Sequence, residues 1–176
     1  MRVLFLLSLL ISSSGPVKDV AAKAAEYMDA AASVTHFSGN VLMAQDGKAV
    51  FVHSYGMADR EKNLPNVVNT KFRTGSITKM FTAAAVLMLR DEGKLKLEDS
   101  VCVYLNGCPE AWRAITIRNL LTHDSGITDD FAILTQMRRE HKSPAEFIEA
   151  IKKRPLESTP GTRNPYSNSG YIVLGG

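Results

Sequence analysis

The chain has 176 residues, of which 45% are hydrophobic and 22% are charged, which is typical of one soluble globular domain with a core. Its net charge is +3, and its basic runs, such as 152–154, are short and lack interleaved aromatic residues. Composition and charge therefore argue against nucleic-acid binding, and no nucleic-acid partner is expected. The sequence also contains no internal repeats and no low-complexity tracts.

The first residues, "MRVLFLLSLLISSSG", have the layout of a secretory signal peptide: one basic residue, an apolar run and then small residues. The apolar run, 3–11, is shorter than the roughly 20 residues that a membrane span needs. We therefore predict a signal peptide over 1–15, a domain over 16–176, secretion or export to the periplasm, and no stable membrane span. An N-terminal core strand or an uncleaved anchor is the alternative.

The predicted elements follow in chain order. Pro16 opens a helical stretch over 16–32, and two β-rich runs on either side of 46–48 predict a hairpin. A polar loop over 61–70 leads to a helix that begins at Ser76 and ends near Gly93. The order is thus a helix, two strands and then mostly helices.

Two cysteines, Cys102 and Cys108, enclose the segment "VYLNG", whose Asn106-Gly107 pair indicates a turn. A local disulfide would fit an oxidising compartment, and two free buried thiols are the alternative. The spacing matches neither a Cys-x-x-Cys redox motif nor a zinc motif.

Two further helices have clear start signals. "ITIRNLLTHDSGI", 115–127, predicts a short helix capped by Thr116 and followed by a loop at 123–126. Ser143, followed by a proline and with a glutamate three residues on, predicts a helix start, and Pro155 ends that helix.

The sheet and the end of the chain raise a problem. A lone two-stranded hairpin is marginal in water and needs further strands or a helix to cover it. The chain also ends on "SGYIVLGG", an apolar run without a capping element. We therefore expect a truncated domain from which the strands that complete the sheet are missing.

The most informative stretch is "GSITKMFTAAAVLML", 75–89, which reads as an apolar helix buried on all sides and yet carries Lys79. At the helix start, Ser76 lies near free backbone N–H groups and the positive end of the dipole. Lys79 lies on the same face one turn along, where the dipole and apolar surroundings disfavour the ammonium form. A neutral amine there could take the serine proton, so the pattern predicts an activated nucleophile.

These residues resemble the serine β-lactamase and penicillin-binding-protein superfamily. The motif 76–79 is similar to its Ser-x-x-Lys motif, and the block 69–99 resembles its nucleophile segment. The segment 115–127 resembles the one that follows. Tyr166-Ser167-Asn168 looks like the Tyr-x-Asn motif of the class C β-lactamase, D-alanyl-D-alanine peptidase and esterase branch. The likeness runs from about Phe37 to the end of the chain.

The resemblance implies an α+β fold of the β-lactamase/transpeptidase type: an antiparallel sheet flanked by helices, with a helical subdomain, here incomplete because C-terminal strands are absent. Ser76 would be the acylated nucleophile, its N–H one oxyanion donor, and Lys79 its activating partner. Tyr166 would shuttle protons, with a core tyrosine as the alternative, and Asn168 would hydrogen-bond Lys79 and the substrate amide. No cofactor or metal is implied.

The sequence departs from the family in one respect. The third motif, Lys-Thr-Gly or His-x-Gly on a C-terminal strand, supplies the second oxyanion donor and is not found in the 176 residues. His123, in "HDSG", belongs to the middle segment, and we interpret it as a structural histidine rather than a base. The other histidines are scattered without metal-ligand spacing.

Three functions follow from these patterns. The first is a serine hydrolase fragment acting on a β-lactam, a D-alanyl or other peptide, or a small ester, with little or no activity in the chain alone. The second is a truncated, non-catalytic product that binds a peptide-like ligand or a partner. The third is a helical interaction module, and it would require that the three segments that resemble the family, in the same order, do so by accident. The substrate and the oligomeric state are left open.

Overall fold

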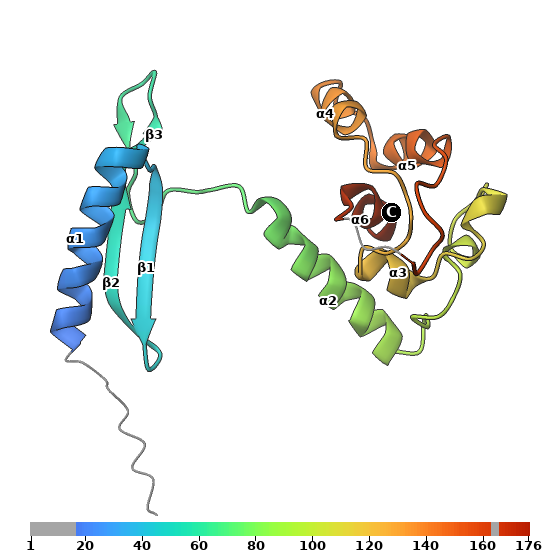
Figure 1. Cartoon of the computed structure of the whole chain (residues 1–176), viewed down its shortest axis with the longest axis horizontal. Coiled ribbons are helices and arrows are strands. Elements are labelled where there is room, and N and C mark those ends of the chain that lie inside the picture. The colour runs from blue at the N-terminus through green and yellow to red at the C-terminus, as the bar shows by residue number, and fades with distance from the viewer. Residues whose placement is uncertain (1–16, 163–165) are drawn as a thin grey trace, which may run out of the picture. The chain divides into compact units, whose positions relative to one another are not determined.

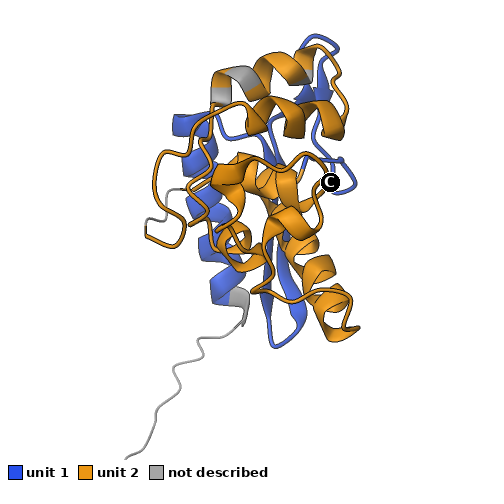
Figure 2. Cartoon of the chain, turned by 90° about the vertical axis from the view of Figure 1, so that its right-hand side faces the viewer, with its two compact units in different colours: residues 1–73 blue, residues 74–176 orange. Residues whose placement is uncertain are grey.

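The computed structural model describes residues 17–162 and 166–176. The chain divides into two compact units, unit 1 with residues 1–73 and unit 2 with residues 74–176 (Figures 1 and 2). The predicted signal peptide, 1–15, lies outside the described residues. Within the part of the chain that is described, no helix is both long and apolar enough to cross a membrane.

Unit 1 consists mainly of a helix against a hairpin. Helix α1 (Val17–Thr35) packs on strand β2 (Lys48–Tyr55), which pairs antiparallel with β1 (Gly39–Gln45) (Figure 1). The two-residue turn has positive φ at both Asp46 and Gly47, 52° and 74°, a geometry that matches the twist of the flanking strands. The predicted helix and hairpin are confirmed.

The polar loop predicted over 61–70 is only partly a loop. Its residues Leu64–Pro65 form strand β4, which pairs antiparallel with β3 (Met57–Asp59). A two-residue strand is too short for an alternating pattern to signal it. Asn66, the residue after β4, links this segment to the end of β2, because its side-chain amide donates to the Tyr55 carbonyl at 2.7 Å.

Unit 2 begins with the predicted long helix. A 3₁₀ turn, η1 (Gly75–Ile77), runs directly into α2 (Thr78–Asp91), so the expected start at Ser76 and end near Gly93 are confirmed. The expected burial on all sides is wrong for the described chain. Val86 is the buried residue of this helix, packing with Leu97 and Ile117, whereas Met80 and Phe81 are 69% and 70% exposed. An apolar composition shows that a helix is able to pack against other elements, but it does not show which of its faces does so.

Short helices surround the core of unit 2. They are η2 (Val101–Val103), η3 (Glu110–Trp112), α3 (Ile117–Leu121), α4 (Phe131–Arg139), α5 (Pro144–Lys152) and α6 (Asn168–Leu174). The largest fully buried side chains are those of Trp112, Ile115, Leu120 and Leu134. The predicted starts of α3 and α5 are confirmed, since Thr116 and Ser143 each form a capping box.

The terminal apolar run folds into α6, an element that the sequence patterns did not predict. The Ser167 side chain caps it by accepting from the Gly170 N–H at 3.1 Å, and Val173 is buried. Helix α6 contacts α2, α3 and α5. These contacts bring the residues just before α6 to the start of α2.

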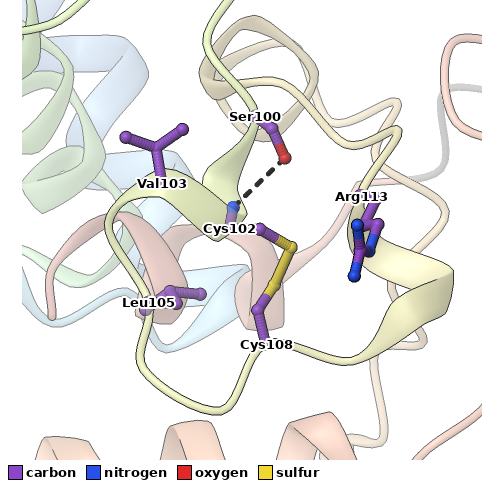
Figure 3. A pocket seen from close by; sticks show the side chains of 6 residues that line it. All are labelled: Ser100, Cys102, Val103, Leu105, Cys108 and Arg113. Atoms are coloured by element: carbon purple, nitrogen blue, oxygen red, sulfur yellow. Dashed lines mark hydrogen bonds between the residues drawn. A yellow bond between two sulfur atoms is a disulfide. The ribbon is translucent and has the colours of Figure 1, made fainter.

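The two cysteines form a disulfide that closes the loop between η2 and η3 (Figure 3). At its first cysteine the Cys102 N–H donates to Ser100 Oγ at 3.2 Å, and inside the loop the Asn106 carbonyl accepts from Lys152 Nζ at 2.6 Å. The disulfide and Arg113 line a surface pocket (Figure 3). None of the residues that line this pocket is among the predicted catalytic residues.

Candidate active site

Ser76 and Lys79 lie where the 3₁₀ turn becomes α2. Ser76 is the middle residue of η1, and the Thr78 N–H donates to the carbonyl groups of Gly75 and Ser76. Lys79 is the second residue of α2 and is half-buried. This tight turn places the hydroxyl and the amine within reach of the same partners from the C-terminal part of unit 2.

Those partners are Tyr166 and Asn168. The Tyr166 hydroxyl donates to Ser76 Oγ at 2.7 Å, although the two residues are 90 positions apart. Lys79 Nζ donates to Asn168 Oδ1 at 2.9 Å and lies 4.9 Å from the centroid of the Tyr166 ring. The structure thus brings together four of the predicted site residues.

Tyr166 occupies an environment that favours its ionised form. Hydrogen bonding to Lys79, and then to Ser76, lowers the pKa of Tyr166, against the opposing effects of burial and of the Asp129 charge. Tyr166 is 54% exposed, so solvent screens part of the effect of the charges. If the phenol ionises, the hydrogen bond must reverse, and Ser76 then donates its proton toward Tyr166.

His123 supports Tyr166 from the loop after α3. Its ring stacks on the Tyr166 ring with centroids 4.6 Å apart, and its Nδ1 accepts from the Ser167 N–H at 3.1 Å. Burial lowers the pKa of His123, and the Lys79 cation acts in the same direction, so the ring is neutral near pH 7. Since Nδ1 accepts, the proton of the neutral ring is assigned to Nε2. These contacts fit a supporting role, and the interpretation of His123 as structural stays a prediction.

Asp129 is a site residue that sequence reasoning missed. Its carboxylate accepts hydrogen bonds from the Asn168 N–H and side-chain amide, both at 2.9 Å, and from the Ser169 N–H and hydroxyl at 2.8 and 3.0 Å. Burial raises the pKa of Asp129, but the bonds from Ser169 and Asn168 outweigh it, so the net shift is downward. No local pattern could have found it, because its partners lie 39 and 40 residues further along the chain.

The loop that leads to Asp129 depends on Gly126. Its φ is +75°, and a Cβ there would lie 2.1 Å from the Ser158 carbonyl oxygen. The Gly126 carbonyl also accepts from the Glu157 N–H at 2.9 Å. Only a glycine allows these two segments to approach so closely.

The arrangement suits nucleophilic catalysis. A serine hydroxyl touches a phenol of lowered pKa, an amine lies beside the phenol ring, and an amide fixes that amine. In residues 17–162 and 166–176, no group of three or more His, Cys, Asp or Glu side chains is placed to hold a metal ion.

Comparison with known proteins agrees with this geometry. The family model described as Beta-lactamase matches residues 20–176. Penicillin-binding protein 4* of Bacillus subtilis (strain 168) is 32% identical over 142 residues, covering 78% of this chain and 31% of the relative. The penicillin binding protein of Bacillus halodurans is 30% identical, with a TM-score of 0.69 over 84% of this chain and 48% of that one. The octameric penicillin-binding protein homologue from Pyrococcus abyssi is 28% identical, with a TM-score of 0.73 over 88% of this chain and 37% of that one.

The chain therefore belongs to the β-lactamase family, within the serine β-lactamase and penicillin-binding-protein superfamily. Its fold is of the β-lactamase/transpeptidase type, as the resemblance implied, and the described residues hold helices and two small, two-stranded antiparallel sheets. The chain spans about a third of the length of the curated relatives that it matches.

Proposed function

We propose that the chain carries the nucleophile half of a serine hydrolase site, in which Ser76 forms an acyl-enzyme. The observation that carries this proposal is the cluster itself. Tyr166 Oη lies 2.7 Å from Ser76 Oγ, and Asn168 Oδ1 lies 2.9 Å from Lys79 Nζ. Family membership adds that this serine and lysine occupy a segment matched by the family model.

In the proposed acylation, the base is the ionised Tyr166, which contacts Ser76 Oγ, rather than the Lys79 amine that the sequence pattern suggested. Tyr166 takes the Ser76 proton while Lys79 stabilises the phenolate. Ser76 Oγ then bonds to the substrate carbonyl carbon, and the carbonyl oxygen becomes an oxyanion that the Ser76 N–H helps to stabilise. Collapse of this intermediate breaks the bond to the leaving group, which takes the proton from Tyr166. Water attacks the ester in the same way, with Tyr166 as the base, and releases the acid and the free Ser76 hydroxyl.

The chemistry and the names of the relatives support a proposal for the substrate class. A serine acyl-enzyme forms on an amide or an ester, so a β-lactam, a D-alanyl or other peptide, or a small ester would serve. The names of the matched penicillin-binding proteins favour a penicillin-like ligand. The disulfide and the leader-like segment 1–15 favour secretion or a periplasmic location.

The test is intact-mass spectrometry of the purified chain after incubation with a fluorescent penicillin or with a fluorophosphonate. We expect each reagent to add one adduct to the wild-type chain and to Ser33→Ala, a matched control on α1, and none to Ser76→Ala. A folded wild-type chain that takes neither reagent would rule out a working nucleophile in these residues.

A second candidate is a non-catalytic protein that binds a peptide-like ligand or a partner. It is favoured by the single oxyanion donor, the Ser76 N–H, that is identified within these 176 residues, since the lack of one oxyanion donor typically costs about 10²- to 10³-fold in rate. Reversible penicillin binding, seen by calorimetry without any adduct, would support this candidate over the first.

A further inference from the structure

Asn168 is held at both its backbone and its side chain by one carboxylate. Asp129 Oδ1 accepts from the Asn168 N–H at 2.9 Å and from the Ser169 N–H at 2.8 Å. Asp129 Oδ2 accepts from Asn168 Nδ2 at 2.9 Å. The first pair of bonds fixes the start of α6, and the last bond fixes the side-chain amide.

The bond to the side chain has a directional consequence. An ionised carboxylate can only accept hydrogen bonds, so the amide nitrogen of Asn168 must face Asp129. The amide oxygen must then point the other way, where it accepts from Lys79 Nζ at 2.9 Å. A flipped amide would place its oxygen against the carboxylate and its NH₂ group against the lysine amine, so both contacts would be lost.

We propose that Asp129 is a positioning residue that sets the orientation of the Asn168 amide and, through it, the place of the Lys79 amine beside Tyr166 and Ser76. This inference rests on the proposed function of Ser76 as a nucleophile. Asp129 does not need to touch the substrate, because it acts through Asn168. Its neighbour Asp130 has a different task, since it accepts from the Arg154 guanidinium at 2.6 Å.

The two adjacent aspartates allow a matched experiment. Asp129→Asn keeps the size of the side chain and one acceptor oxygen, but it can place an NH₂ group where Asn168 Nδ2 needs an acceptor. We expect the rate of Ser76 acylation by a fluorescent penicillin or a fluorophosphonate to fall about 10- to 100-fold. Asp130→Asn should stay within about threefold of the wild type.

A double-mutant cycle separates positioning from a general loss of structure. In an Asn168→Ala background, adding Asp129→Asn should slow acylation little further, because both changes remove the same link to Lys79. Losses that simply add would overturn the proposal, and so would an Asp129→Asn chain that reacts at the wild-type rate.

A measurement without activity keeps the two proposals distinguishable. In the wild type, the NMR signal of the Asn168 side-chain NH₂, assigned by its loss in Asn168→Ala, should exchange slowly with solvent. In Asp129→Asn it should exchange rapidly. Fast exchange in the wild type would overturn the inference even if Asp129→Asn fails to fold. Slow exchange in a wild-type chain that is never acylated would instead count against the proposed function alone.

Discussion

Removing one hydroxyl, that of Tyr166, should separate catalysis from stability. Tyr166→Phe deletes the 2.7 Å hydrogen bond to Ser76 and keeps the ring that stacks on His123. Tyr166 is 54% exposed, so we expect the free energy of unfolding to change by less than about 0.5 kcal/mol. A positioned general base contributes about 10²- to 10⁴-fold, so acylation should slow by that factor, or about 3 to 5 kcal/mol of barrier.

The pH dependence of this effect has a definite sign. Hydrogen bonding to Lys79 and Ser76 lowers the pKa of Tyr166, so its phenolate forms at a lower pH than that of a free tyrosine, which titrates near pH 10. Acylation of the wild type should therefore rise with pH and level off below about pH 10, and Tyr166→Phe should lack this rise. The assay is the rate of fluorescent-adduct formation measured from pH 6 to pH 10.

Tyr171→Phe is the matched control. Its hydroxyl donates to the Leu121 carbonyl at 3.1 Å, and burial raises the pKa of this tyrosine. The change should lower the free energy of unfolding by about 1 kcal/mol and leave acylation nearly unchanged. Equal acylation rates and pH profiles for Tyr166→Phe and the wild type would refute the assignment of Tyr166 as the base.

Three further predictions concern stability. Replacing Cys102 and Cys108 by serine should lower the free energy of unfolding by about 2 kcal/mol, measured by urea denaturation. The reason is that the unfolded chain gains conformational entropy once the disulfide no longer closes this short loop. Gly126→Ala should lower the thermal midpoint, because its Cβ would meet the Ser158 carbonyl at 2.1 Å; an unchanged midpoint would contradict the close approach. The folded-state pKa of Asp129 is lowered, so its stabilisation is present at neutral pH and is lost as pH falls through that value. The free energy of unfolding of the wild type should therefore fall more steeply toward acid pH than that of Asp129→Asn, which lacks this titration. Equal pH profiles of the two chains in urea denaturation would contradict this role of Asp129.

The core of the site could be predicted from sequence because its signals are local. Ser76 and Lys79 are three residues apart at a helix start, and Tyr166 and Asn168 form a second short motif. Their chemistry requires these residue types, so the resemblance gave candidate roles before any contact was known. The contacts between the two motifs, over 89 and 90 positions, come from the packing of α6 on α2.

The supporting residues could not be predicted in this way. Asp129 follows a glycine loop and has no periodic or capping signal of its own, and its partners are on another element. His123 reaches the Ser167 backbone over 44 positions. The burial of α2 was predicted wrongly for a related reason: a stretch such as 80–89, which is almost wholly hydrophobic, does not reveal which face of the helix packs against a neighbour.

The most direct test of the account is peptide mapping of the chain after reaction with the fluorescent penicillin. Cleavage after Arg73 and Lys79 releases the peptide 74–79, in which Ser76 is the sole serine. The account predicts one adduct, carried by Ser76 in this peptide and absent from Ser76→Ala. An adduct on any other peptide, or none on a folded chain, would contradict the claim that Ser76 is the nucleophile.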